Sequence, residues 1–482
     1  MGEIEEGLQE LFFKTFNKEA QHISLLKASG SARKYFRMQS GDFSAIGAYN
    51  QDIKENNAFL ILSHYFAQKN ISVPKIYNDD LTKNIYLISD LGEQTLYGLL
   101  VENRENENDF PQTLIETYKQ VLSELLKIQF CFEPDFDFSF AYPRAAFDGQ
   151  SIMWDLNYFK YYFLKLAKVH FDEQLLENDF NTLKDFLLQA NSDFFLYRDF
   201  QSRNIMICDD KLFFIDYQGG RKGALQYDVA SLLYDAKANI PQKIKELLLD
   251  YYVEQLAQKY PSEAQNFKKY YYAFVLIRIM QAMGTYGYRG FYENKTHFLQ
   301  SIPYALRNLE YLLNNVQLPI EIPTLWNIYN QLIDTEHLKQ YQFPKLTVSI
   351  NSFSYKKSIP TDKNGNGGGF VFDCRCLPNP GRFDQYKNLT GKDQLVIDYL
   401  NNEQEINEFF QHSKSIIDMA VKNYIDRGFQ YLMINYGCTG GQHRSVYFAE
   451  RLQKYLKNNY SINTEIKHFN EQDWAGQTQL DC

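Results

Sequence analysis

The first part of the chain combines short hydrophobic runs typical of β-strands with hydrophobic residues at helical spacing. Between residues 23 and 88, short hydrophobic runs are separated by Gly, Ser, Asn and Asp, a pattern typical of β-strands joined by turns. Within this region, NNAFLILSHYFAQKN (56–70) has hydrophobic residues at roughly i, i+3, i+4 and i+7, which predicts a helix. The pattern therefore indicates a small lobe of mixed strands and helix.

Helical spacing dominates the next part of the chain, at about 112–190 and again at about 225–315. Between these regions, residues 194–218 return to short strands around polar loops. The two prolines of LPIEIPTLWN (318–327) end the second helical region, and a helical connector is expected over 328–341. The pattern predicts a second, mainly helical lobe and then a linker.

The last part of the chain opens with a strand at 345–355 and continues with the turn-rich DKNGNGGG (362–369). Strands and helices then alternate, with helices expected near 403–427 and from His443 to about Lys457. This order of elements predicts an α/β unit.

A chain of 482 residues is long enough for two or three domains. We expect the following boundaries from the pattern: a first domain over 1–316 (lobes 20–92 and 93–316), a helical linker over 317–344, an α/β domain over 345–470, and a tail over 471–482.

Composition and charge narrow the class of protein. The formal net charge of −9 argues against broad nucleic-acid binding. The most hydrophobic run, YYAFVLIRIM (271–280), is too short to span a bilayer and contains Arg278. The six cysteines form no C-x-x-C pair, and MGEIEEGLQE lacks the apolar region of a secretion signal. We expect a soluble cytoplasmic protein that does not associate with membranes; the sequence leaves a homo-oligomer open.

The strongest chemical signal in the first domain is YRDFQSRNIM (197–206) followed by FFIDYQGG (213–220). Phosphoryl transfer from ATP needs a carboxylate to orient the acceptor hydroxyl and oxygen ligands to hold Mg²⁺ against the phosphates. Asp199 fits the first role, and Asn204 and Asp216 fit the second. The alternative is that both segments are solvated hairpin tips.

The nucleotide is expected beneath the first lobe. KASGSARKYFRM (27–38) reads as strand, polar turn and strand, and its backbone N–H groups could cover phosphates. ISDLG (88–92) would connect the lobes and offer backbone groups to an adenine. The candidate nucleotide-binding residues are Ser29, Gly30, Ser31, Arg33, Lys34, Arg37, Ser89, Asp90 and Leu91.

Together these motifs resemble the aminoglycoside phosphotransferase and choline kinase superfamily. Through ASGSARKYFR, LISDLGEQTL, FDGQSIMWDLNYF, YDVASLLYD and MGTYGYRG, the chain looks closer still to the anomeric kinases of N-acetylmuramate and N-acetylglucosamine over about 20–315. The resemblance implies a bilobal, protein-kinase-like α+β fold, ATP and Mg²⁺ as cofactors, Asp199 as catalytic base, and Asn204 and Asp216 as metal ligands.

Two departures from the superfamily concern the catalytic machinery. Tyr197 stands where the family usually has His before its catalytic loop, and FSAIGAYN (43–50) lacks the third-strand lysine that pairs with the phosphates. Arg33, Lys34 or Arg37 could replace that lysine.

Residues that select the acceptor are harder to identify from the sequence. FDGQSIMWDLNYFKYYF (147–163) combines aromatic residues with Asp148 and Asp155, a composition that suits a sugar as well as a helix packed into the core. Arg289 could pair with a substrate carboxylate. We expect Asp228 to be a structural anchor.

GCTGGQHRS (437–445) links a hydrophobic strand to an amphipathic helix. Its glycines and the helix N-terminus favour an anion site, to which Arg444 and His443 can add donors. The C-x5-R spacing from Cys438 also matches a cysteine phosphatase loop, for which Asp373 is a candidate general acid. Binding and hydrolysis both remain open from the residues alone.

SFSYKKSIP, FVFDCRCLPNPGR, NLTGKD and GCTGGQHRSVYFAERL resemble the C-terminal domain of the RNase adaptor protein RapZ, over about 345–470. That resemblance implies a smaller α/β domain with a phosphate-binding loop and a ligand similar to glucosamine-6-phosphate. It favours binding over hydrolysis. The residues that it places at the site are Asp373, Arg375, Cys438, Thr439, Gly440, Gly441, His443 and Arg444.

RNA binding is not expected for this second domain. The residues from Ser349 onward carry 15 Lys and Arg against 15 Asp and Glu, and the basic residues are scattered. RNA binding needs a dense positive surface to displace counterions from the phosphates.

The sequence therefore predicts an ATP-dependent kinase of a small hydroxylated substrate, an amino sugar phosphorylated at its anomeric hydroxyl in cell-wall recycling, joined to a phosphosugar-sensing module. Two alternatives stay open. One is a regulatory or RNA-linked adaptor with a catalytically silent kinase fold, and the other is a bifunctional kinase and phosphatase.

Overall fold

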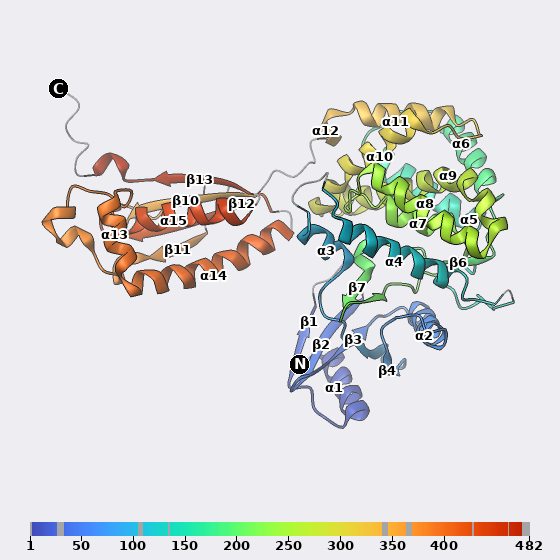
Figure 1. The fold of residues 1–482 in the computed structure, drawn as a ribbon, viewed down its shortest axis with the longest axis horizontal. Helices are drawn as coiled ribbons and strands as arrows, with labels where there is room; N and C mark the ends of the chain where they lie inside the picture. Colours follow the sequence, from blue (N-terminus) through green and yellow to red (C-terminus); the bar gives the residue numbers. More distant parts are fainter. Residues whose placement is uncertain are drawn as a thin grey trace. The chain divides into compact units, whose positions relative to one another are not determined.

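The computed structural model describes residues 2–26, 33–104, 109–133, 135–339, 346–362, 369–426, 429–460 and 462–474. The chain divides into two compact units, Met1–Lys339 and Gln340–Cys482 (Figure 1). Each unit has its own hydrophobic core, and each is described by itself below.

The first unit begins with a five-stranded antiparallel sheet in the order β1-β2-β3-β5-β4. Helix α1 packs on one face of this sheet through Leu8, Leu11 and Phe12, which share a core with Met38 and Leu87. The elements of this lobe are α1 (Glu3–Phe16), β1 (His22–Leu25), β2 (Lys34–Ser40), β3 (Phe43–Tyr49), α2 (Ile53–Gln68), β4 (Ile76–Asp80) and β5 (Ile85–Ser89).

The second lobe is mainly helical, as the hydrophobic spacing predicts. Its long helix α9 (Pro261–Tyr286) is buried along much of its length and packs against α5, α7 and α8. The other helices are α3 (Leu96–Glu102), α4 (Gln112–Gln129), α5 (Gly149–Phe159), α6 (Glu173–Leu187), α7 (Gln226–Leu233), α8 (Gln242–Lys259) and α10 (Ile302–Asn315). The polar loops of this lobe lie between four short strands: β6 (Phe194–Leu196), β7 (Ile205–Cys208), β8 (Lys211–Phe214) and β9 (Arg221–Gly223).

Two helices lie within the stretch expected as a linker, α11 (Pro323–Asp334) and α12 (Glu336–Lys339). Helix α11 buries Leu325, Ile328 and Leu332, and the Leu325 N–H donates to Asp179 of α6 at 2.8 Å. Both helices therefore belong to the first unit instead of forming a free connector.

The second unit is a four-stranded, fully parallel sheet in the order β11-β12-β10-β13. Its core joins the strands to three helices through residues such as Ile350, Tyr436, Phe448 and Ile417. The elements are β10 (Thr347–Ser354), β11 (Phe370–Asp373), α13 (Gln394–Asn402), α14 (Gln404–Asp426), β12 (Tyr431–Cys438), α15 (Arg444–Asn459) and β13 (Asn463–His468).

This unit confirms the predicted α/β class, with one difference in its helices. The single helix expected near 403–427 is preceded by α13, and the two are separated by Glu403, whose backbone is extended (φ −86°, ψ 122°). Within the described residues of both units, no helix is long and apolar enough to cross a membrane.

Candidate active site and anion loop

A buried carboxylate fixes the backbone of the loop that follows β6. Asp228, in the first turn of α7, accepts hydrogen bonds from the backbone N–H groups of Tyr197 (2.7 Å) and Arg198 (3.0 Å). Burial raises the pKa of Asp228 to about 7, while these two donors act in the opposite direction. The Tyr197 hydroxyl, fully buried, donates to the carbonyl of Ile215 at 2.7 Å. Asp228 is thus the structural anchor of the loop, and Tyr197 ties the loop to the strand before Asp216.

The three residues expected to carry the chemistry lie together. The Asn204 side-chain amide donates to the backbone carbonyl of Asp199 at 2.9 Å and to a carboxylate oxygen of Asp216 at 3.4 Å. Asp216 adopts a left-handed backbone conformation (φ 68°), which is uncommon for a residue other than glycine and turns its side chain toward Asn204. The geometry brings two carboxylates and an amide to one place.

The electrostatics of this cluster fit a divalent cation. Burial raises the pKa of Asp216, and the negative charge of Asp199 raises it further. A bound cation would offset both effects, and carboxylate and amide oxygens are ligands that Mg²⁺ prefers. Among the described residues, no group of three or more His, Cys, Asp or Glu could form a metal site, so the candidate ligands remain the mixed pair of Asn204 and Asp216.

A cavity of about 420 Å³ lies between the first sheet and this cluster. Its walls are apolar at Leu26, Ile46 and Met206, and its polar end is formed by Asn204 and Asp216. The segment Ser89–Gly92 also lines it, as expected for the connection between the lobes. Apolar walls combined with the polar groups of Arg37, Asp90, Asn204 and Asp216 suit an aromatic base together with phosphates.

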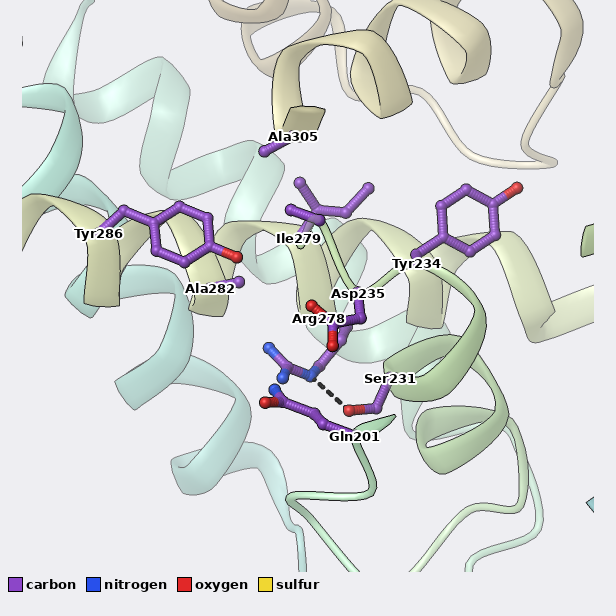
Figure 2. Close-up of a pocket in the computed structure, with 10 residues that line it drawn as sticks. Gln201, Ser231, Tyr234, Asp235, Arg278, Ile279, Ala282, Tyr286 and Ala305 are labelled. Atoms are coloured by element: carbon purple, nitrogen blue, oxygen red, sulfur yellow. Dashed lines mark hydrogen bonds between the residues drawn. The ribbon is translucent and has the colours of Figure 1, made fainter. Parts of the chain in front are cut away.

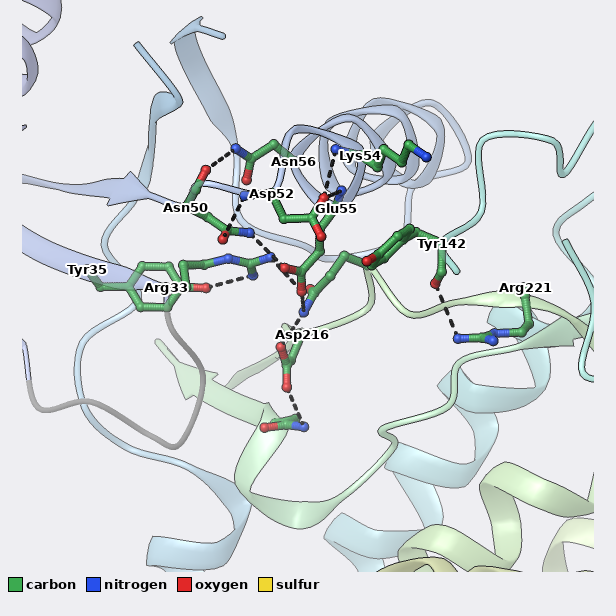
Figure 3. A network of polar contacts seen from close by, with 12 residues as sticks. Arg33, Tyr35, Asn50, Asp52, Lys54, Glu55, Asn56, Tyr142, Asp216 and Arg221 are labelled. Atoms are coloured by element: carbon green, nitrogen blue, oxygen red, sulfur yellow. Dashed lines mark hydrogen bonds and ion pairs between the residues drawn. The ribbon is translucent and has the colours of Figure 1, made fainter. Parts of the chain in front are cut away.

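Arg33, one of the cations expected to replace the missing lysine, is buried and pairs with the partly buried Glu55. One of its guanidinium nitrogens lies 3.1 Å from Glu55 of α2, and another donates to the Tyr35 hydroxyl at 3.1 Å (Figure 3). Burial by itself lowers the pKa of Arg33, but Tyr35, Tyr86 and Glu55 together raise it above the ordinary value. Arg33 therefore stays charged inside the lobe.

A chain of polar contacts connects this ion pair to Asp216. The Gln218 side-chain amide donates to Asp216 at 2.7 Å and to Glu55 at 3.3 Å. Asn50 donates to the other oxygen of Glu55 at 2.7 Å (Figure 3). Glu55 is thus shared between the strand lobe and the end of the cavity at Asp216.

The other two cations considered for the phosphates lie elsewhere. Arg37 lines the cavity at its connecting segment, where it pairs with both oxygens of Asp90 (2.8 and 3.2 Å) and with Glu93 (2.7 Å). Lys34 is exposed. Ser29, Gly30 and Ser31 lie outside the described residues, so their expected role stays a prediction.

The carboxylates expected to bind a sugar have protein partners. Both oxygens of Asp155 accept from the Arg198 guanidinium at 2.7 Å, which orients the residue before Asp199. Asp148 begins α5, where it accepts from the Ser151 N–H at 3.0 Å and pairs with Arg144. Arg289 pairs with Glu293 at 2.7 Å and lines the nucleotide cavity. None of the three lines the cavity beside Asp199 described next.

A second cavity, about 140 Å³, opens beside Asp199. Arg278 lines it and also lines an adjoining smaller pocket, where it lies between Gln201 and Ser231 of helix α7 with Asp235 nearby (Figure 2). Arg203 and Lys237 also line it. Sequence reasoning missed these cations; Arg203 could have been noticed between Asp199 and Asn204, but no sequence signal marks Lys237 or Arg278.

In the second unit, the loop after β12 wraps around Cys438. The Cys438 sulfur accepts the Gly441 backbone N–H at 3.2 Å and lies 3.1 Å from the Ser445 hydroxyl oxygen. Gly441 has φ +68°, and its carbonyl accepts from Trp474 at 2.9 Å, so the turn that aims its N–H at the sulfur is fixed on both sides. Cys438 itself is buried.

Arg444 turns its guanidinium partly away from this loop. One terminal nitrogen donates to the carbonyls of Arg375 (3.1 Å) and Leu377 (2.8 Å), while the buried Nε has no hydrogen-bond partner among the described residues. Thr439 and Gly440 are exposed, and no described atom lies within 4 Å of where a Cβ on Gly440 would be. The loop therefore has an open face at Gly440 and an unused donor at its base.

The remaining residues expected at this loop are engaged with other groups. Asp373 pairs with Arg375 through two close contacts (2.9 and 2.6 Å), and Arg375 stacks over Tyr355. His443 contacts the Tyr386 carbonyl at 2.9 Å, and burial lowers its pKa. Thus the hydrogen bonds and ion pairs of Asp373 and His443 are made with residues other than Cys438.

Comparison with known proteins separates the chain into the same two parts. Residues 32–265 match the phosphotransferase enzyme family, and residues 346–471 match the RapZ C-terminal domain.

Among curated proteins, a nucleotide-binding protein of Hahella chejuensis is 33% identical over 187 residues, which cover 36% of this chain and 62% of the relative. A nucleotide-binding protein of Thermosipho africanus is 34% identical over 173 residues, covering 33% of this chain and 60% of the relative. The chain thus spans about three fifths of the length of the curated relatives it matches.

Solved structures similar to the chain include ADP-bound aminoglycoside phosphotransferase APH(2'')-Ib (14% identity, TM-score 0.39, covering 56% of this chain and 90% of that chain). Another is a choline kinase from Cryptosporidium parvum Iowa II (13% identity, TM-score 0.44, covering 68% and 99%). Both TM-scores lie below 0.5, and we draw no functional conclusion from either likeness. The two family matches cover separate segments: residues 32–265 are similar to the phosphotransferase enzyme family, and residues 346–471 are similar to the RapZ C-terminal domain.

Proposed function

We propose that the first unit is an ATP-dependent phosphotransferase that acts on a hydroxyl group of a small molecule. The observation that carries the proposal is the Asn204 amide, which contacts both the Asp199 backbone and the Asp216 carboxylate at the junction of two cavities. The nucleotide occupies the cavity of Asp216, and the acceptor enters the cavity of Asp199.

Asp199 orients the acceptor hydroxyl and takes its proton as the phosphoryl group is transferred. Its backbone is fixed by Asp228 through the two preceding residues, and Arg198 is fixed by Asp155, so little reorganisation is needed for reaction. Mg²⁺ held by Asn204 and Asp216 would neutralise charge on the phosphates. Arg33, paired with Glu55, supplies the fixed positive charge of the strand lobe.

The acceptor that we propose is an amino sugar, N-acetylmuramate or N-acetylglucosamine, phosphorylated at the anomeric hydroxyl in cell-wall sugar recycling. The support is the resemblance of the sequence motifs to anomeric sugar kinases and the hydrogen-bonding character of the second cavity, where Gln201, Gln281 and Thr285 can contact sugar hydroxyls.

The experiment that tests this function measures ADP release from Mg²⁺-ATP with N-acetylmuramate, N-acetylglucosamine, glucosamine, an aminoglycoside and choline as acceptors. Phosphorus NMR of the product identifies the oxygen that was modified. The variant Asp199→Asn should lower kcat by about 10²- to 10⁴-fold because it removes the proton acceptor. Asp210→Asn, an exposed aspartate in the β7–β8 turn, is the matched control. ATP binding without turnover on any acceptor would favour the silent adaptor instead.

We further propose that the second unit binds a phosphosugar such as glucosamine-6-phosphate at the open face of the Cys438 loop. The support is the exposed Gly440 beside the N-terminus of α15, a helix of 16 residues whose positive end favours anions, together with the unused Nε of Arg444.

Gly440→Val tests this binding without disturbing the core, since a Cβ at this position meets no described atom. Calorimetry with the full chain should show that glucosamine-6-phosphate binds the parent protein and binds the variant at least tenfold more weakly. The melting temperature should be unchanged. If both proteins bind glucosamine-6-phosphate with equal affinity, the loop is not part of the binding site.

One observation is also in line with hydrolysis at this loop: the Cys438 sulfur, the nucleophile that such a reaction would use, accepts a backbone N–H and lies against the Ser445 hydroxyl. The Asp373 carboxylate, however, is paired with Arg375, so a general acid is not in place. We therefore retain binding as the proposed role.

A further inference from the structure

The cavity beside Asp199 carries more positive charge than its own protein groups balance. Arg203, Lys237 and Arg278 line it, against the carboxylates of Asp199 and Asp235. It shares no lining residue with the nucleotide cavity. These cations therefore face the acceptor side of the active site.

Arg278 is the informative member of this set because it is buried and lacks an acidic partner. The residue is 5% exposed. Its Nε donates to the Ser231 hydroxyl at 2.9 Å (Figure 2), and a terminal nitrogen donates to the side-chain amide oxygen of Gln281 at 2.6 Å. Within the described part of the chain it forms no ion pair with a carboxylate. Buried charges are normally paired, so a buried guanidinium whose two hydrogen-bond partners are neutral points to an anion that comes from outside.

Lys237 and Arg203 add charge nearer the solvent. Lys237 is exposed as a residue, but burial around its ammonium group lowers the pKa of that group, and the positive charge of Arg203 lowers it further. Neither side chain makes a hydrogen bond or an ion pair with a described residue. A negative charge placed between the Lys237 ammonium and the Arg203 guanidinium would stabilise the charged form of both.

The nearby acid offsets only part of this charge, because Asp235 raises the pKa of Lys237 against the larger effects of burial and Arg203. Asp235 accepts the backbone N–H of Lys237 at 3.1 Å and lies 3.3 Å from the Ser202 hydroxyl. Asp199 is committed to the acceptor hydroxyl in the proposed reaction. The balance around the cavity is three cations against two carboxylates.

We propose that this cavity binds an anionic group of the acceptor, a carboxylate or a phosphate, with Arg278 at its inner end and Lys237 and Arg203 at its rim. The enzyme then selects hydroxylated acceptors that already carry a negative charge. This inference rests on the proposed phosphotransferase function and names the class of its acceptor. Charge-assisted hydrogen bonds to an anion orient the acceptor so that its hydroxyl lies at Asp199.

The test compares acceptors that differ only in charge. N-acetylmuramate and its carboxyl methyl ester present the same hydroxyls, and glucosamine-6-phosphate and glucosamine form a second pair that distinguishes phosphate from carboxylate. We expect the KM of the parent protein to be at least tenfold lower for one acid than for its neutral partner, the size of a charge-assisted contact.

Lys237→Met should raise the KM of the anionic acceptor about tenfold and leave the KM of the neutral partner and of ATP unchanged. Lys237→Arg should restore the preference. Lys243→Met, an exposed lysine on α8, is the matched control. Lys237 is preferred to Arg278 for this test because removal of the buried guanidinium could disturb folding.

Two results would overturn the inference. One is an equal KM for charged and neutral acceptors, and the other is a rise in the KM of ATP in Lys237→Met, which would assign the cation to the nucleotide. If no acceptor turns over, the proposed function fails separately, and calorimetry with a non-hydrolysable ATP analogue decides the inference. Tighter binding of an acid than of its neutral partner supports it, and equal or absent binding rejects it.

Discussion

At the scale of single residues, Arg33 shows how a kinase-like lobe can hold a cation without a third-strand lysine. The side chain enters from the residue preceding β2 and reaches Glu55 on α2 at 3.1 Å. Glu55 is in turn bound by Asn50 and Gln218, and Gln218 contacts Asp216. The positive charge is therefore connected to Asp216 through a defined chain of contacts.

Replacing Arg33 should affect ATP specifically. Arg33→Met removes the ion pair and should lower kcat/KM for ATP at least tenfold, since the partly buried Glu55 then loses its charged partner. Arg33→Lys keeps the charge but loses the planar fork, and should recover part of the activity. ADP-release kinetics with varied ATP measure the effect. Lys34→Met, the exposed neighbour on β2, should behave as the parent, and equal losses in both variants would contradict the assignment.

At the scale of elements, α7 fixes the catalytic loop from its first turn. Asp228 accepts the N–H groups of Tyr197 and Arg198, where Arg198 has φ +82° and needs such support. Asp155 of α5 holds the same arginine through its guanidinium. Two helices far apart in the sequence thus determine the conformation of the residue before Asp199.

Burial raises the pKa of Asp228 from the ordinary 3.8 to about 7. An acid whose pKa is raised by folding binds protons more tightly in the folded state. Its contribution to stability is therefore complete below about pH 4 and is lost as the pH rises toward 7. Asp228→Asn should remove this component, so the melting temperature of the variant relative to the parent should rise between pH 4.5 and pH 7. Thermal unfolding across this range measures the difference; a constant offset would show that Asp228 does not titrate there.

Sequence and structure agree on element type more than on boundaries or partners. The strand expected at 345–355 is β10 (Thr347–Ser354), and the helix expected from His443 is α15 (Arg444–Asn459). Helix α13 was missed because the nine residues of Gln394–Asn402 bury only Val396 and Leu400, too few for a clear period. Helix α1 was missed for another reason, since only its packing on the sheet identifies it as part of the strand lobe.

At the scale of the whole molecule, two units with separate cores occur in one chain, and their family matches do not overlap. The proposed kinase makes a sugar phosphate, and the proposed sensor binds one. This pairing motivates the view that the second unit responds to a product or a related metabolite of the first. The Gly440→Val variant, which changes the second unit alone, can be used to test whether ligand binding to that unit depends on this loop.

The sequence by itself determined the chemistry that depends on short spacing. Asp199, Asn204 and Asp216 lie within 18 residues, and Cys438 to Arg444 within seven, so strands and tight loops must keep each set together. Only the tertiary structure decided which distant groups serve them. Arg33 pairs with Glu55 and Arg198 pairs with Asp155, while Arg278 and Lys237 line one cavity. Each set is brought together because packed helices and strands place residues that are far apart in the sequence side by side. These long-range contacts depend on how the core packs, and the packing cannot be read from the residues near each position in the sequence.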